Sequence, residues 1–381
     1  MDTSVAEITT LSENITLYND LNKLNDTTLK TSLSENIIDD KNINVNNNIN
    51  TNENIVSADN LPTKFWTKKD PYNKPLSIPQ DYLFRDNVFD DIRPFISKYY
   101  DTSTNIVQLT ESEYKWFTSI PHVQCSLYHN DIIIGYCMGL SLPMIVDGEE
   151  KKVGHTSFLT VHPDYREKGI APILIRKIME LFGEDGYRAG YHQTSKPIKN
   201  HTIMNCGLRP IKHKSASNYG INVGKGTHSQ LRKKYALVNN NYKMVEGCLD
   251  ELPNIFSIKT DWIKKYIVDN KLSPFKSWII NNVNMVIVRI VNVRFQNKSN
   301  VISLPIINLI YVPDSKEMIN VLNRVFLEYS DYPYIYIYQC GGLTSETLYK
   351  LNGYKLRDDS YINYYNIDQE IKLNDIYSIF Y

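Results

Sequence analysis

One segment near the middle of the chain constrains the fold more than any other, because it joins an apolar strand to an amphipathic helix through a short loop. Residues 153–161 are predicted to form the strand, and the sequence His162-Pro163-Asp164-Tyr165 is typical of a turn. The helix is predicted over residues 171–182, where the apolar side chains fall on one face, and Gly183 ends it. A strand followed directly by such a helix favours an α/β fold.

The loop between this strand and this helix has the features of an anion site. Backbone N–H groups at a helix N-terminus lack partners, and the helix dipole favours a negative group such as a pyrophosphate beside them. Gly169 and Ala171 are small enough to let phosphates approach the backbone, and Arg166 and Lys168 add positive charge. Pro172 stands in the first helical turn, where its missing N–H costs little. An ordinary strand-to-helix connection with a solvated basic turn is the alternative.

A similar order of elements returns in the second part of the chain, which predicts two α/β halves. In the first half, a hairpin of buried strands is expected over residues 125–142, before the strand and helix described above. In the second half we expect a helix, two strands, a helix and a strand, at residues 260–269, 277–289, 302–312, 315–329 and 334–338. The similar order of elements suggests duplication, and the lack of a shared sequence motif suggests that the two halves then diverged.

Composition divides the chain into four segments. Residues 1–60 are dominated by Asn, Asp, Thr and Ser, so they cannot bury enough apolar surface to fold and are expected to form a disordered tail. Large aromatic residues and prolines then begin, and the first half is expected over residues 61–211. Residues 212–241 are rich in glycine and basic side chains and are expected to be a linker or a long loop, and residues 242–381 form the second half.

Charge and cysteine content exclude several classes of protein. Lys and Arg together number 42, as do Asp and Glu, so no global basic field exists to collect nucleic acid or anionic lipid. We therefore expect no nucleic-acid partner, and any recognition of charge must be local. No metal site is predicted and a reducing compartment fits best, because the cysteines are scattered without a CxxC pair: Cys125, Cys137, Cys206, Cys248 and Cys340.

The chain is expected to be a cytoplasmic monomer without an integral membrane segment. Its start has no basic region leading into an apolar stretch, as a secretory signal would. The longest apolar run, Ile132 to Val146, is interrupted by Pro143 and is shorter than the roughly 20 residues that a membrane span needs.

The predicted anion loop resembles the acyl-CoA loop of the GNAT acyltransferases, whose pattern Arg/Gln-x-x-Gly-x-Gly/Ala follows a strand as it does here. A wider set of motifs resembles the N-myristoyltransferases, in order and spacing, over about residues 61–381. These motifs are Lys64-Phe65-Trp66, Leu-Ser-Ile-Pro-Gln at residues 76–80, Phe158 to His162, Lys168 to Arg176, Lys196-Pro197 and Tyr364-Tyr365.

This resemblance implies a mixed α/β fold in which two fused GNAT-like halves form a saddle-shaped mixed sheet with flanking helices. The first half would bind acyl-CoA, and the second would bind most of a peptide. The implied reaction is direct transfer of a myristoyl group from myristoyl-CoA, a co-substrate rather than a permanently bound cofactor, to the α-amine of an N-terminal glycine of a protein.

The resemblance also assigns residues to this site. The backbone amides of Phe158 and Leu159 would form the oxyanion hole, and the C-terminal carboxylate, on Tyr381, would be the general base. Where the family has a threonine near the substrate amine this chain has His192, which either takes part in handling the amine or is a bystander. The residues expected to hold the CoA are Lys64, Phe65, Trp66, Phe158, Leu159, Thr160, Val161, Arg166, Glu167, Lys168, Gly169, Ile170, Ala171 and Pro172.

The chemistry of a thioester agrees with this assignment. A thioester is already activated, so a catalyst needs donors for the developing oxyanion and an acceptor for the amine proton, and needs no nucleophilic side chain. The chain indeed carries no recognisable nucleophile–base signature. Two alternatives remain: a GNAT-type acyltransferase with a different amine acceptor, and a non-catalytic relative that binds acyl-CoA or peptides.

Overall fold

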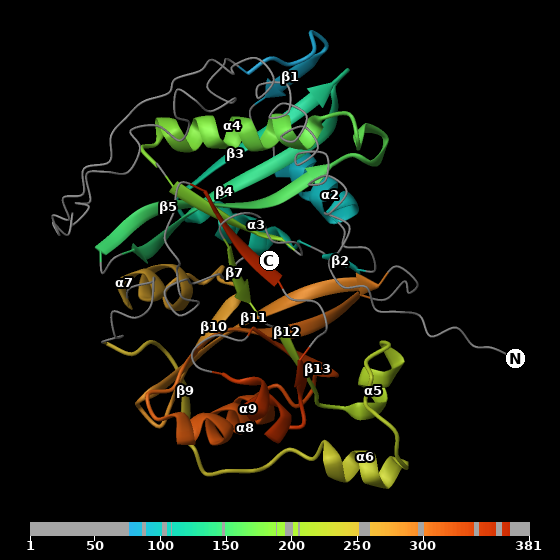
Figure 1. Cartoon of the computed structure of the whole chain (residues 1–381), viewed down its shortest axis with the longest axis vertical. Helices are drawn as coiled ribbons and strands as arrows, with labels where there is room; N and C mark the ends of the chain where they lie inside the picture. Colours follow the sequence, from blue (N-terminus) through green and yellow to red (C-terminus); the bar gives the residue numbers. More distant parts are fainter. Residues whose placement is uncertain are drawn as a thin grey trace, which may run out of the picture.

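The computed structural model describes residues 76–85, 89–100, 105–107, 109–146, 149–187, 189–194, 201–204, 206–250, 260–295, 301–338, 343–355 and 360–365. The strands form two mixed sheets, and helices lie between and outside them (Figure 1). The predicted α/β class is therefore confirmed. The Asn-rich tail, the Lys64-Phe65-Trp66 motif and Tyr381 lie outside the described residues.

The first sheet begins with an antiparallel meander, continues with one parallel pair, and ends with two antiparallel strands, β15 (Ser360–Tyr365) and β7 (His201–Met204). Its strand order is β1-β3-β4-β5-β6-β15-β7. Strands β5 and β6 run parallel and are joined through α4. The strand predicted over residues 153–161 and the helix predicted over residues 171–182 lie within β5 and α4. The bounds are β1 (Tyr82–Arg85), β3 (His122–His129), β4 (Ile132–Val146), β5 (Glu149–Val161), η3 (Pro163–Tyr165), α4 (Ile170–Glu184) and β6 (Ala189–Thr194).

The second sheet repeats this plan. Strands β10, β11 and β12 form an antiparallel meander, and β13 returns parallel to β12 after α8. The order β10-β11-β12-α8-β13 thus matches β3-β4-β5-α4-β6 of the first sheet. The bounds are β9 (Met244–Glu246), α7 (Thr260–Ile263), η4 (Lys264–Val268), β10 (Phe275–Ile280), β11 (Asn284–Phe295), β12 (Val301–Tyr311), η5 (Ser315–Glu317), α8 (Met318–Glu328) and β13 (Tyr334–Tyr338).

The two halves exchange strands. Strand β7 (His201–Met204) stays at the edge of the first sheet, but β8 (Cys206–Pro210) crosses to the second sheet and pairs with β13. In the same way β14 (Tyr354–Lys355) stays in the second sheet, and β15 (Ser360–Tyr365) crosses to lie between β6 and β7. Each sheet therefore contains strands from both sides of residues 212–241.

The segment expected to be a linker or long loop contains two short helices, α5 (His213–Asn218) and α6 (His228–Lys234). A capping box begins α6: the Thr227 hydroxyl accepts from the N–H of Gln230, and the Gln230 side chain accepts from the N–H of Thr227. This pair satisfies two N–H groups that would otherwise lack partners, so it fixes where the helix starts.

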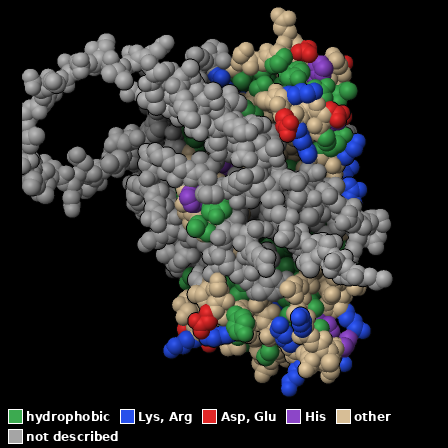
Figure 2. All heavy atoms as spheres, turned by 45° about the vertical axis from the view of Figure 1, so that its right-hand side comes forward, with side chains coloured by type: hydrophobic (Ala, Val, Ile, Leu, Met, Phe, Trp, Pro, Cys, Tyr) green, Lys and Arg blue, Asp and Glu red, His purple; other side chains and the backbone are tan. Residues whose placement is uncertain are grey.

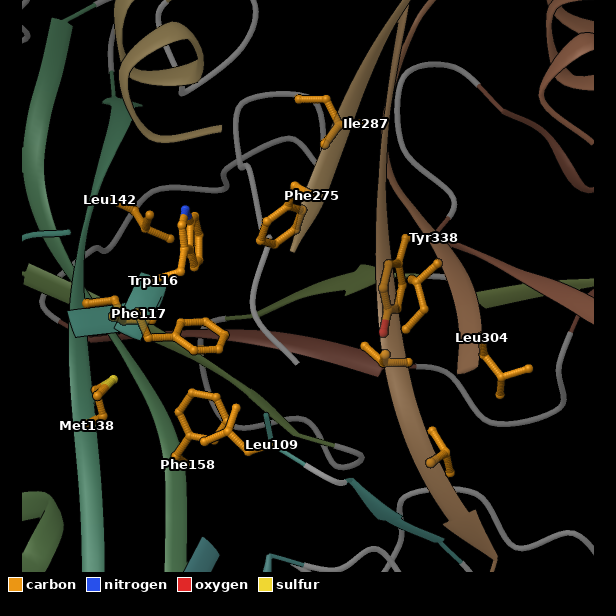
Figure 3. Packing of buried hydrophobic residues seen from close by; sticks show 14 of the residues in the cluster. Leu109, Trp116, Phe117, Met138, Leu142, Phe158, Phe275, Ile287, Leu304 and Tyr338 are labelled. Carbon is orange, nitrogen blue, oxygen red and sulfur yellow. The ribbon is translucent and has the colours of Figure 1, made fainter. Parts of the chain in front are cut away.

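One apolar core fills the space between the sheets. Helices α2 (Phe89–Tyr99) and α3 (Glu111–Ser119) lie in this space, and the strand β2 (Asn105–Val107) pairs with β11. Figure 3 shows Trp116, Phe117 and Phe158 facing Phe275 and Tyr338 across it. The outer face of the first sheet is covered by α4, and that of the second by α8 and α9 (Ser345–Lys350). Among the described residues, no helix is long and apolar enough to cross a membrane.

A buried ion pair joins the halves inside this shared core. Glu113 of α3 lies 3.5 Å from the Arg289 guanidinium of β11, and the two side chains are 6% and 1% exposed. Glu113 also accepts hydrogen bonds from the N–H and the hydroxyl of Thr110, at 2.9 and 2.8 Å. The aromatic rings of Phe117 and Phe275 lie against the guanidinium, 5.3 and 5.8 Å away. Glu113 thus ties the first half to the second.

We predict that Glu113→Gln destabilises the fold, because it removes the negative charge 3.5 Å from the buried Arg289 guanidinium while an amide oxygen can still accept from Thr110. Breaking a buried pair costs about 3–5 kcal/mol. Urea unfolding measures the change. The control is Glu111→Gln on the same helix, whose salt bridge to Lys115 is half-exposed and is expected to contribute nothing measurable. Equal unfolding midpoints for the two variants would contradict the proposed role of the buried pair.

Candidate functional site

A β-bulge interrupts β5 at the residues that the sequence analysis assigned to an oxyanion hole. Tyr136 of β4 pairs with Thr160, but Met138 already pairs with Ser157, so Phe158 and Leu159 together face a single residue of β4. The backbone of Phe158 has a φ of 52°, which a bulky residue rarely adopts. A bulge of this kind changes the direction in which backbone groups point and is often found beside active sites.

The strands β5 and β6 part at the same place. Their parallel ladder runs from Val153 opposite Ala189 to His155 opposite Tyr191 and ends there. Phe158 and Leu159 lie beyond its end, so neither pairs with β6 in this ladder, and we call this break in the ladder the opening between the strands. Beyond Tyr191, β6 is held on its other side by β15, where His192 pairs with Asn363.

Aromatic rings fix the side chain of Phe158 in the shared core. It is 1% exposed, and its ring contacts those of Phe117 and Tyr100 at centroid distances of 4.9 and 5.5 Å. Next to it, the Thr160 hydroxyl donates to the carbonyl of Phe158 at 3.0 Å. These contacts hold the backbone of the bulge in one conformation, which is what a preorganised donor site requires.

The predicted anion loop follows β5 directly and is open to solvent. Gly169 is the N-cap of α4, with a φ of 77° and no side-chain cap, and a Cβ atom at this position would meet nothing within 4 Å. Glu167 also has a positive φ, of 62°. Glu167, Lys168 and Gly169 are exposed, whereas Ile170 and Ala171, the first two residues of α4, are buried in the core beneath the helix and anchor the loop. The backbone that an anion can reach is therefore that of residues 167–169, directly before the first turn of α4, whose own residues Ile170 and Ala171 have no exposed surface.

The two basic residues of the loop have different roles. The Arg166 guanidinium donates to the carbonyls of Val161 and Tyr99, both at 3.4 Å, and so ties the loop to β5 and α2. Lys168 is exposed, and its ammonium lies 5.0 Å from the ring of Tyr165. The Tyr165 hydroxyl is bonded to the His129 ring at 2.6 Å. Of the two expected cations, Lys168 is the one free to meet a phosphate.

Two histidines lie near the opening between β5 and β6. Burial lowers the pKa of His192 to about 4. Burial, together with the neighbouring His192, lowers the pKa of His155 to about 3. The His155 ring is 2% exposed and contacts the ring of Tyr191 at 4.7 Å. Both imidazoles are therefore neutral near neutral pH and can exchange hydrogen bonds without carrying charge.

Three of the described cysteines, Cys125, Cys137 and Cys248, lack the features of a nucleophile. Burial raises the pKa of the Cys125 and Cys137 thiols, and it raises that of Cys248 to about 11. A thiol with a raised pKa stays protonated at neutral pH and does not attack a thioester. Cys340 lies outside the described residues. Within the described part of the chain, no group of His, Cys, Asp or Glu could hold a metal ion.

The structure brings together most of the residues expected at the site. Phe158 to Val161, the loop residues from Arg166 to Pro172, and His192 lie on β5, on the start of α4 and on β6, which adjoin one another. Sequence reasoning missed His155, because its position opposite Tyr191 depends on the register of a parallel pair that no local pattern reveals.

Comparison with known proteins supports an acyltransferase fold. Residues 86–197 match the acetyltransferase (GNAT) family. The putative glycylpeptide N-tetradecanoyltransferase of Melanoplus sanguinipes entomopoxvirus is 31% identical over 116 residues, which are 30% of this chain and 39% of the viral protein. The chain thus matches about two fifths of the length of that curated relative.

Solved structures match over a larger part of the chain. Saccharomyces cerevisiae N-myristoyltransferase with bound myristoyl-CoA superposes with a TM-score of 0.63 and 12% identity, covering 77% of this chain and 85% of that one. A further structure of the yeast enzyme, with myristoyl-CoA and inhibitors, gives a TM-score of 0.65 and 10% identity over 81% of this chain and 86% of that one. The chain has the N-myristoyltransferase fold. The expected pair of fused GNAT-like halves is thereby confirmed.

We predict that His155 makes the stability of the protein depend on pH. Its pKa of about 3 in the fold lies below the value of about 6.5 in an unfolded chain, so the unfolded state binds the extra proton first. This contribution is fully present above about pH 6.5 and is lost as the pH falls. Between about pH 7 and pH 5 the loss is about 2 kcal/mol.

The test compares the free energy of unfolding at the two pH values for the wild type and for His155→Gln. On going from about pH 7 to pH 5, the free energy of unfolding of the variant is expected to fall by about 2 kcal/mol less than that of the wild type. The control is His228→Gln, on the exposed helix α6, which should show the wild-type difference. A His155→Gln protein with the wild-type pH dependence would show that the imidazole is not held neutral by burial.

Proposed function

We propose that the chain transfers a myristoyl group from myristoyl-CoA to the α-amine of an N-terminal glycine. The observation that carries this proposal is the bulge at Phe158 and Leu159, placed where β5 and β6 part and followed directly by the open loop at the start of α4. The name of the viral relative and the myristoyl-CoA bound in the yeast structures support this choice of acyl group.

In this proposal the loop binds the CoA and the bulge binds the reacting carbonyl. The pyrophosphate lies against the exposed backbone of residues 167–169 and near Lys168, and the thioester lies beside the backbone of β5. The amine nitrogen attacks the thioester carbon, and the N–H groups of Phe158 and Leu159 stabilise the oxyanion that develops. The C–S bond then breaks, the amide forms, and the second amine proton passes to the departing sulfur, so CoA leaves as the thiol.

The glycine ammonium must lose a proton before it can attack. An α-amino group has a pKa of about 7.7–8.0, whereas His192 has a pKa of about 4, so full proton transfer to His192 would be uphill by about 5 kcal/mol. His192 therefore serves as a neutral hydrogen-bond acceptor that orients the amine. The resemblance assigns the base to the carboxylate of Tyr381, which lies outside the described residues.

The proposed reaction is tested with a panel of acyl-CoAs, from acetyl- to stearoyl-CoA, and two peptides that differ only in starting with Gly or Ala. Product mass is the readout. We expect transfer of the myristoyl group to the Gly peptide, and none to its Ala counterpart. Transfer to a lysine or a small amine would instead support a GNAT-type enzyme with another acceptor. Binding of acyl-CoA without any product would support a non-catalytic relative.

The role of the loop is tested by Gly169→Asp, which places a negative charge in open space beside the predicted phosphates. We expect acyl-CoA binding, measured by calorimetric titration, to weaken by at least about tenfold, or about 1.4 kcal/mol. Gly169→Asn is the matched control, because Asn has nearly the same shape and tolerates positive φ but carries no charge. Equal losses in both variants would assign the effect to backbone strain, and unchanged binding in both would show that phosphates do not lie here.

The two candidates for handling the amine proton predict different kinetics. A few residues added after Tyr381 would displace its carboxylate, so kcat should fall by about 10²- to 10⁴-fold while acyl-CoA affinity is kept. The same residues added at the N-terminus are the control. His192→Ala should lower kcat by less than about tenfold, because an orienting acceptor contributes less than a base. Normal turnover of the extended protein would exclude Tyr381 as the base.

A further inference from the structure

Positive charge is concentrated on residues 212–243, although the chain as a whole has no net charge. This segment contains no Asp or Glu, and its basic residues are all exposed: Lys212, Lys214, Lys225, Arg232, Lys233, Lys234 and Lys243. Several Lys and Arg side chains gather at the lower end of the molecule in Figure 2, where Figure 1 places α5 and α6.

Among the described residues, most of these cations form no salt bridge with a carboxylate. Lys212 is bonded to Asp331 at 3.2 Å, and the nearby Glu346 of α9 is paired with Lys350 at 2.8 Å. The basic residues on α5, on α6 and between these helices form what we call the basic surface: Lys214, Lys225, Arg232, Lys233 and Lys234. None of them forms a salt bridge within the part of the chain that the structure describes.

An open cavity of about 350 Å³ adjoins this surface. It is lined by Asn222, Gly224, Lys234, Tyr235, Tyr349, Asn352 and Gly353. The Tyr349 side chain is 79% exposed, which is unusual for so large a ring. The Lys234 ammonium lies 3.6 Å from the position that a Cβ atom on Gly224 would occupy. The cavity therefore offers a cation, amide groups and an exposed aromatic face together.

The walls of the cavity are held in place by contacts behind them. The Tyr235 ring is 4% exposed, and its hydroxyl donates to the carbonyl of Val223 at 2.9 Å. A Cβ atom on Gly353 would lie 2.5 Å from Leu348 and 3.1 Å from the carbonyl of Leu208, so this wall is close-packed. The cavity is thus formed before any ligand arrives, which lowers the entropic cost of binding.

A second positive charge lies behind Tyr235. Arg209 of β8 is 2% exposed, donates to the carbonyl of Tyr235 at 3.5 Å, and lies over the rings of Tyr235 and Phe326. Its side chain makes no salt bridge to any carboxylate among the described residues. Because the interior screens poorly, this charge adds to the positive potential at the cavity.

We propose that the cavity and the basic surface bind single-stranded nucleic acid. One nucleotide fits a cavity of this size, with its base on Tyr349 and a phosphate at Lys234, and the basic surface takes the neighbouring phosphates. Cations beside an exposed aromatic ring are the combination that single-strand binders use. An anionic membrane is flat and would use neither the cavity nor a ring set among amide side chains. The zero net charge of the chain led to the expectation of no nucleic-acid partner. That expectation missed this surface, because the net charge of a whole chain does not show that basic residues are gathered on one segment.

The test measures binding of fluorescein-labelled RNA and DNA of one sequence, of about 12 nucleotides, to the full chain by fluorescence anisotropy at several salt concentrations. We expect binding that weakens steeply with salt. The variant Arg232→Gln/Lys233→Gln/Lys234→Gln should bind at least about tenfold more weakly and lose about 2 from the slope of log K against log salt. Tyr349→Ala should weaken binding at least about fivefold, and Tyr349→Phe should keep it.

A second triple variant, Lys98→Gln/Lys265→Gln/Lys271→Gln, removes the same charge from exposed lysines elsewhere and should bind like the wild type. All variants should keep normal acyl transfer and thermal unfolding, so the result is independent of the proposed enzyme activity. Three outcomes would overturn the proposal: no binding of either oligonucleotide, equal losses in the two triple variants, or tighter binding to vesicles of phosphatidylcholine and phosphatidylserine that Tyr349→Ala does not change.

Discussion

The exchange of strands between the halves is the constraint on which the rest of the structure depends. Along β6, the ladder to β5 covers residues 189–191, whereas the ladder to β15 covers residues 190–194. A strand that leaves its neighbour exposes N–H and C=O groups, and these must find other partners when they are buried. The strand β15, from the far end of the chain, supplies partners on one edge. The opening beside the bulge is therefore stabilised by the other half of the molecule.

The shared core reinforces this dependence. Trp116 of α3 donates its indole N–H to the carbonyl of Tyr266 at 2.5 Å, and the Glu113–Arg289 pair lies on the same helix. Phe117, one residue along from Trp116, packs against both Phe158 and the Arg289 guanidinium. One helix thus links the backbone of the bulge to the second sheet. A change in how the halves pack would be felt at the site.

Local features of this fold could be predicted from the sequence, and long-range ones could not. The strand, loop and helix over residues 153–182 follow from neighbouring residues, and they were found. The capping box at Thr227 and Gln230 is also a local pattern that predicts a helix start. It lies in residues 212–241, which the content of glycine and basic residues had assigned to a linker or a long loop. The pairing of β15 with β6 joins residues about 170 positions apart, and the positive φ of Phe158 is imposed by tertiary packing. Neither leaves a pattern in the nearby sequence.

Comparing the two halves shows why the proposed acyl-CoA site lies in the first one. Strand β12 has an irregularity like that of β5: Ile287 pairs with Leu309 and Val288 with Ile307, so Asn308 is the extra residue. Asn308 lacks the positive φ of Phe158, and the helix that follows, α8, has Glu317 rather than a glycine as its N-cap. An acidic N-cap repels a phosphate where Gly169 admits one. The second half therefore has the same order of elements as the proposed acyl-CoA site without the residues proposed to bind the phosphates.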